Sequence, residues 1–66
     1  MPMINLKITK GESTAQQKAQ VIREMTEVLQ RVMGKNPDTT IVIIEEVDTD
    51  NWGIGGKSVT QRRAED

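Results

Sequence analysis

The stretch Thr-Thr-Ile-Val-Ile-Ile-Glu-Glu-Val at residues 39–47 is rich in β-branched residues and nearly continuous in apolarity. This pattern predicts a strand, and a strand that is apolar on both faces is normally buried on both. A polar turn is expected at 48–51. The glycine-rich segment 53–56 that follows permits unusual backbone angles, so 57–60 could form another short strand. The last residues, 61–66, have the composition of a charged tail.

Two elements are predicted upstream of this stretch. In residues 3–9 the side chains point alternately to two faces, and every second one from residue 4 is a branched aliphatic side chain; this period of two predicts a strand. Across 15–33 the apolar positions step by three and four, which predicts an amphipathic helix about 30 Å long. Either Ser13 or Thr14 could cap its start, because each has a Gln three residues on. Gly34 fits the position just beyond its end.

The order of these elements predicts the fold class. A strand–helix–strand unit of this length favours parallel strands joined by a right-handed crossover. One helix covers only one face of a two-stranded sheet, whereas the second strand needs cover on both, and a chain of 66 residues has little else to offer. We therefore expect an α/β fold: a β-α-β subunit with parallel strands and a C-terminal hairpin-like tail. Residues 1–66 would be a single domain that assembles as a homo-oligomer.

Composition excludes several classes of function. The chain has no cysteine and no histidine, which removes disulfides, thiol nucleophiles, the usual metal ligands and the usual base near neutral pH. A net charge of −1 and a single aromatic residue argue against nucleic-acid binding. The aliphatic run at 41–44 is far too short to span a membrane. Missing cysteine fits a cytoplasmic protein, and we expect no metal site and copies of the chain itself as partners.

Pro2 is the candidate for acid–base chemistry. Removal of a methionine before proline is an ordinary processing event, and it would turn the nitrogen of Pro2 into a free secondary amine. An apolar pocket or a nearby cation would lower the pKa of that amine towards working pH. In a chain without His or Cys, such an amine is a natural general base.

Larger segments of the chain resemble a known family. The resemblance is to the small-subunit tautomerases typified by 4-oxalocrotonate tautomerase, and it spans residues 2 to about 63. It implies a β-α-β subunit, usually assembled as a hexamer of three dimers. It also implies a proline amine that moves protons in enol–keto isomerisation without a cofactor. The segments that carry it are Met-Pro-Met-Ile-Asn-Leu at 1–6, Val-Ile-Arg-Glu at 21–24, Val-Ile-Ile-Glu-Glu at 42–46 and Asn-Trp-Gly-Ile-Gly-Gly at 51–56.

The resemblance also implies roles for single residues. Pro2 matches the catalytic base. Trp52 stands where the family usually has Phe, as an apolar wall near the proline; it could equally fill an interface between subunits. Ile54 lies in the matching Gly-Ile-Gly segment, and Thr39 falls where the family often has a small hydroxyl residue. These three residues are the expected substrate contacts.

Two departures from the family pattern concern substrate binding. The type member has an arginine just after the first strand, where this chain has Gly11 followed by Glu12, and a second arginine where this chain has Ile41. Those arginines are taken to bind a dicarboxylate substrate, and their loss removes bidentate carboxylate recognition. The candidate replacement cations are Lys7, Lys10, Lys35 and Lys57.

The expected function is enol–keto tautomerisation of a small unsaturated 2-hydroxy or 2-oxo acid, an isomerase reaction with Pro2 as general base. One alternative is a hydratase or dehalogenase in which protonated Pro2 assists addition of water activated by Asp50 or Glu12. The other is a non-catalytic oligomeric binding module that keeps only the fold, because both arginines are absent.

Overall fold

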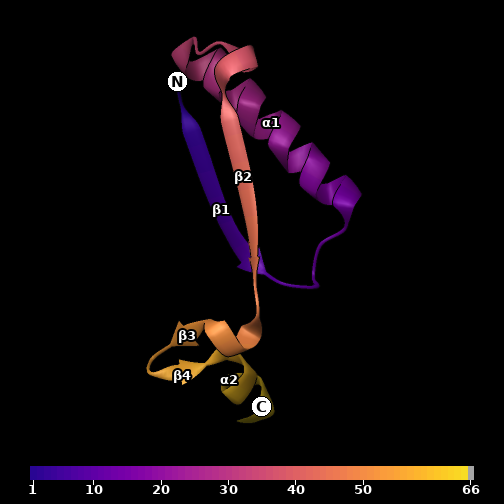
Figure 1. Cartoon of the computed structure of the whole chain (residues 1–66), viewed down its shortest axis with the longest axis vertical. Helices are drawn as coiled ribbons and strands as arrows, with labels where there is room; N and C mark the ends of the chain where they lie inside the picture. Colours follow the sequence, from indigo (N-terminus) through magenta and orange to yellow (C-terminus); the bar gives the residue numbers. More distant parts are fainter. Residues whose placement is uncertain (66) are drawn as a thin grey trace.

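The computed structural model describes residues 1–65 of the chain. The expected order, strand, helix, strand and then a hairpin, is confirmed (Figure 1). Within those residues, no helix is long and apolar enough to cross a membrane. The elements are β1 (Met3–Thr9), α1 (Ala15–Met33), the 3₁₀ turn η1 (Pro37–Thr39), β2 (Ile41–Val47), the 3₁₀ turn η2 (Thr49–Asn51), β3 (Gly53–Ile54), β4 (Lys57–Ser58) and α2 (Val59–Glu65).

β1 and β2 form a parallel two-stranded sheet, as the β-α-β order predicts. The register runs from Met3 opposite Ile41 to Thr9 opposite Val47. Figure 1 shows the two strands side by side, with α1 crossing the sheet and the β3–β4 hairpin and α2 at its far end. The two short strands pair antiparallel.

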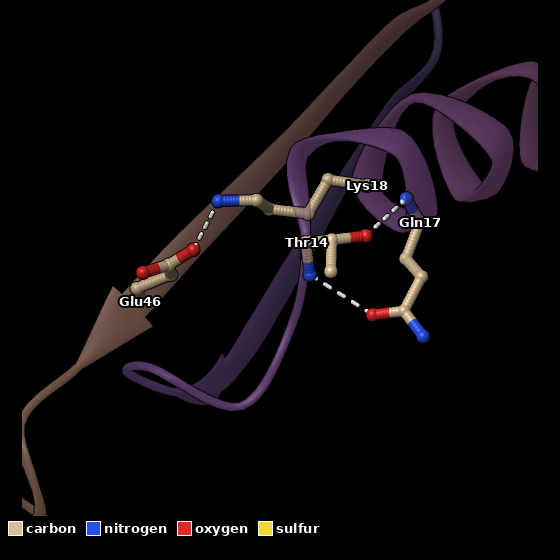
Figure 2. A network of polar contacts seen from close by, with 4 residues as sticks. All are labelled: Thr14, Gln17, Lys18 and Glu46. Atoms are coloured by element: carbon tan, nitrogen blue, oxygen red, sulfur yellow. Dashed lines mark hydrogen bonds and ion pairs between the residues drawn. The ribbon is translucent and has the colours of Figure 1, made fainter.

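Helix α1 begins with the capping box that the sequence predicts (Figure 2). Of the two candidate caps, Thr14 is the one used. The backbone N–H of Gln17 donates to the Thr14 hydroxyl over 3.0 Å, and the backbone N–H of Thr14 donates to the Gln17 side chain over 2.9 Å. Gly34 ends the helix in the left-handed region, at φ 65°, as glycine does most easily.

An ion pair between Lys18 and Glu46 shows which face of the sheet α1 covers (Figure 2). Glu46 lies opposite Ile8, so strand alternation puts Ile4, Ile8, Val42 and Ile44 on the helix-covered face, and all four are half-buried. The opposite face has no helix of this chain over it within residues 1–65. It carries Met3, Asn5, Lys7, Ile41, Ile43, Glu45 and Val47.

The single chain has no core of its own. Among residues 1–65, no residue is fully buried. The radius of gyration is 15.3 Å, whereas a compact chain of this length has about 11 Å. Its accessible surface is 5034 Å², against about 4200 Å² for a folded monomer of this mass. The shape is that of one part of a larger assembly.

Two segments differ from the sequence-based expectation. The strand predicted over 39–47 starts at Ile41, because Pro37 opens a 3₁₀ turn in which the Asn36 side chain accepts the backbone N–H of Asp38. Thr40 donates its hydroxyl to the same Asn36 at the backbone oxygen, over 2.8 Å. Local side-chain bonds thus replace the first two rungs of the strand.

The predicted charged tail is wrong for residues 61–65, which belong to α2; residue 66 lies outside the described residues. The backbone N–H of Gln61 donates to the Ser58 hydroxyl over 3.1 Å, and the backbone N–H of Ser58 donates to the Gln61 side chain over 2.9 Å. This is a second capping box, Ser-Val-Thr-Gln at 58–61, and it also stops β4 at Ser58.

Candidate functional site

Pro2 lies at the amino end of the sheet, next to the start of β2. The backbone N–H of Ile41 donates to the Pro2 carbonyl over 3.0 Å, which extends the ladder by one rung. Pro2 is half-buried, while Met1 before it is 89% exposed. While Met1 is attached, the Pro2 nitrogen belongs to a peptide bond and has no basicity.

Thr39 belongs to the same end of the molecule. It closes η1, two residues before β2 begins, and its hydroxyl donates to the Asn36 carbonyl over 3.3 Å. The structure therefore brings Thr39 and Pro2 to one edge of the sheet. Ile41, where the family type has an arginine, lies opposite Met3 and is 38% exposed, so this edge is apolar.

Trp52 and Ile54 lie at the opposite end of the long axis (Figure 1). Trp52 follows η2 and is half-buried, and its carbonyl accepts the backbone N–H of Val59 over 2.7 Å. Ile54 in β3 is 50% exposed. The expectation that the Pro2 amine lies near the 52–54 segment is therefore wrong within one subunit, because the parallel strands separate the start of β1 from the end of β2.

An open hollow of about 360 Å³ lies beside Trp52. Its remaining lining comes from the uncovered face of the sheet, from η2 and from the start of β3: Lys7, Val47, Asn51 and Gly53. Lys7 and Val47 were not placed beside Trp52 by the sequence argument. Strand parity contained the signal, since both residues fall on the odd-numbered face that the helix leaves open.

A second hollow, of about 400 Å³, lies beside the start of α1, and neither Pro2 nor any of the three expected substrate contacts lines it. Its lining is mostly polar and includes Glu24, a carboxylate that would repel an acidic substrate. We therefore take the Trp52 hollow as the site, although it is slightly smaller.

A polar cluster on the uncovered face adjoins the Trp52 hollow. Glu45 accepts a hydrogen bond from the Asn5 amide over 2.8 Å and forms an ion pair with Lys7 over 2.7 Å. The hydrogen bonds from Lys7 and Asn5, together with the Lys7 charge, hold the pKa of Glu45 below its ordinary value of 4.5. On the other face, the Lys18 ammonium lowers the pKa of Glu46 in the same way.

The other candidate cations are placed differently. Lys10 lies 3.7 Å from Asp48, and Lys57 lies 2.5 Å from Glu65. Lys35 belongs to the connection between α1 and η1, at the end where Pro2 lies. Glu12, at the position of the first missing arginine, forms an ion pair of 2.6 Å with Arg63 of α2, a contact that the sequence argument missed.

Comparison with known proteins identifies the family. A family model described as tautomerase enzyme matches residues 2–62. The chain belongs to the tautomerase family. It is 60% identical over 63 residues to probable tautomerase K2 of Dickeya dadantii, with 96% of this chain and 94% of that protein covered. It is 42% identical over 65 residues to a probable tautomerase of Helicobacter pylori, with 96% of each chain covered.

Solved structures agree with this tautomerase assignment. DmpI from Helicobacter pylori matches with a TM-score of 0.86 at 39% identity, covering 98% of this chain and all of that chain. TomN, a 4-oxalocrotonate tautomerase homologue of the tomaymycin biosynthetic pathway, matches with a TM-score of 0.89 at 30% identity, covering 96% and 95%. The resemblance to the 4-oxalocrotonate tautomerases and the β-α-β fold are thus confirmed, and this tautomerase is an isomerase by class.

Proposed function

We propose that this tautomerase interconverts the enol and keto forms of a small unsaturated 2-hydroxy or 2-oxo acid without a cofactor, and that Pro2 is its general base once Met1 has been removed. The observation that supports this most directly is the placement of Pro2. Its carbonyl is fixed to the first rung of the sheet, whereas Met1 projects with 89% of its surface exposed and accessible to a processing enzyme.

The proposed proton transfer needs a single group. The neutral amine of Pro2 accepts the proton of the 2-hydroxyl, and the oxygen becomes a carbonyl as the π electrons shift along the conjugated chain. The ammonium then returns the proton to a carbon of that chain, so the amine is restored and no atom is gained or lost. The chain has no His or Cys that could replace the amine.

The site requires more than one copy of the chain. Pro2 and Thr39 lie at one end of the subunit, and Trp52 and Ile54 at the other. A second copy related by a two-fold axis perpendicular to the strands runs antiparallel, so its Trp52 end meets the Pro2 end of the first. We propose a homo-oligomer of six copies built from three such dimers, which would also cover the apolar part of the open sheet face around Ile41 and Ile43. A cytoplasmic location remains a prediction.

One observation favours isomerisation over the hydratase alternative. Both carboxylates suggested for activating water already have partners, since Glu12 pairs with Arg63 and Asp50 accepts the Thr60 hydroxyl over 2.6 Å.

The pH profile of the rate separates the two reactions. Isomerisation needs the neutral amine and its rate should rise with pH to a plateau, whereas hydration needs the protonated amine and its rate should fall.

The decisive experiment compares the processed protein with a form whose N-terminus is blocked, either by retained Met1 or by acylation. Intact mass first establishes which form is present. Ketonisation of 2-hydroxypenta-2,4-dienoate, followed by ultraviolet absorbance, should be fast for the processed protein and absent for the blocked one. Equal rates would place the base elsewhere, and no turnover by either form would favour the non-catalytic binding module.

A further inference from the structure

We propose that Lys7, together with the Asn51 amide, binds the carboxylate of the ligand in the Trp52 hollow. The inference rests on the proposed function for the identity of the substrate, while the anion site itself follows from the side chains that meet in the hollow. The sequence named four lysines as possible replacement cations and did not distinguish among them; this inference selects Lys7.

The hollow contains one cation and no carboxylate among its lining residues in the part of the chain that the structure describes. Lys7 extends from β1 on the face that α1 does not cover, and its side chain is 58% exposed. Val47, which lines the same hollow, lies on this face two residues after Glu45 in β2. A negatively charged group entering here therefore meets an ammonium above an apolar floor.

The ion pair with Glu45 leaves Lys7 able to bind a ligand. An ammonium has three N–H donors, and Glu45 takes one of them over 2.7 Å. Glu45 itself is engaged at both oxygens, one accepting from Lys7 and the other from the Asn5 amide. Lys7 is thus held beside the hollow with two donors available.

The same pair limits what the site can bind. Glu45 offsets much of the Lys7 charge, and an ammonium lacks the planar fork with which a guanidinium holds a carboxylate. The site therefore suits one carboxylate rather than two, and its affinity should be modest. Under the proposed function, such a site would favour a monoacid over a diacid.

The remaining lining fits a flat unsaturated chain attached to that carboxylate. Trp52 supplies the wide apolar surface, Gly53 has no side chain that would fill the space, and Asn51 contributes an amide whose N–H groups can donate to the anion. The volume of about 360 Å³ lies within the range of small-molecule sites.

Trp52 also provides the measurement, because it is the sole tryptophan in a chain without tyrosine or phenylalanine. The probes are sorbate, a flat unsaturated monocarboxylate, and sorbamide, its neutral amide. Binding is followed by the change in Trp52 fluorescence on titration of the processed, assembled protein. This readout does not require turnover, so it separates failure of the carboxylate site from failure of the proposed function.

The sharpest comparison is between Glu45→Gln and the double variant Lys7→Met/Glu45→Gln. Both lack the Glu45 charge and the ion pair, so they differ in the cation alone. We expect the double variant to bind sorbate about tenfold or more weakly than Glu45→Gln, and sorbamide equally. Glu45→Gln alone should bind sorbate more tightly than the unaltered chain, since the Lys7 charge is no longer offset. Lys10→Met, outside the hollow, is the matched control and should change neither affinity.

Equal sorbate affinity in Glu45→Gln and in the double variant would overturn the proposal, as would an equal loss of sorbate and sorbamide. If no form ketonises an enol but sorbate binding still depends on Lys7, the carboxylate site stands and the proposed reaction fails. Light scattering of each variant shows that the assembly is intact.

Discussion

The guanidinium of Arg63 donates a hydrogen bond of 2.6 Å to the carboxylate of Glu12, although the two residues are 51 positions apart. The contact joins α2 to the loop between β1 and α1. It also neutralises the carboxylate that stands where the family type has an arginine. A closed ion pair therefore stands where the resemblance implies a free cation.

The first prediction concerns the dicarboxylate substrate of the family. With Glu12 paired and Ile41 apolar, kcat/KM for 2-hydroxymuconate should be well below that for the monoacid 2-hydroxypenta-2,4-dienoate. Loss of one charge-assisted carboxylate contact costs about 2 kcal/mol, which is about thirtyfold in rate. Side-by-side steady-state kinetics on the two acids check this. Equal or better activity on the diacid would show that other cations have taken over the role of the arginines.

The second prediction concerns the base. Pro2→Ala keeps a terminal amine after processing but makes it primary and more mobile. Enol ketonisation should fall about tenfold or more without vanishing, because the proton acceptor is still present but less well positioned. Light scattering should show the same assembly as the unaltered chain. A Pro2→Ala protein with full activity would contradict a role for the ring nitrogen.

The third prediction concerns the open face of the sheet. Ile43 lies opposite Asn5 on this face and is 39% exposed in the single chain. Ile43→Asp would place a charge where another copy is expected to pack, and an unpaired buried charge costs several kcal/mol. We expect the oligomer to dissociate, as measured by sedimentation. Gln30→Asp on the outer side of α1 adds the same charge and should leave the mass unchanged. An intact assembly in the Ile43 variant would place the interface elsewhere.

The fourth prediction concerns acid stability. The pKa of Glu45 and the pKa of Glu46 are both lowered, by Lys7 with Asn5 and by Lys18 respectively. A carboxylate with a lowered pKa stabilises the folded state fully above its ordinary pKa of 4.5, and this contribution disappears as pH falls through the lower, folded value. Thermal unfolding should therefore show a fall in Tm below about pH 4.5. The double variant Glu45→Gln/Glu46→Gln should be less stable at pH 7 and should show a shallower fall.

The fifth prediction concerns the start of α1. Thr14→Ala removes the hydroxyl that accepts the Gln17 N–H and should destabilise the fold by about 1 kcal/mol. Ser13→Ala is the matched control, since the sequence allowed either residue to be the cap, and it should cost less than about 0.5 kcal/mol. Chemical denaturation at fixed protein concentration measures both. A larger loss for Ser13→Ala would mean that the cap has shifted by one residue.

Features set by neighbouring residues were readable from the sequence. The alternation of 3–9, the helical period of 15–33 and the glycine after it are local patterns, and the structure confirms each. The start of helix α2 also had a local signal, the capping box of Ser58 and Gln61. This signal is easily missed, because the box lies between a glycine-rich turn and a run of charged residues. A short helix has too few residues to show a period.

The arrangement of the site was less predictable, because it depends on contacts distant in sequence. Arg63 and Glu12 meet through the path of the whole chain, and Lys7 comes to line the same hollow as Trp52 through the register of β1 on β2. The separation of Pro2 from Trp52 follows from the parallel strands that the sequence did predict. Combining parallel strands with the positions of the two residues would have placed them at opposite ends.

A chain with no buried residue among 1–65 gains its core only when it meets its copies. Folding and association then become a single event governed by mass action, so Tm should rise with protein concentration. Specific activity should likewise fall on dilution and recover when the protein is concentrated again, with a lag that shortens as the chain concentration rises. For such a protein, the cellular level of the chain itself sets how much enzyme exists.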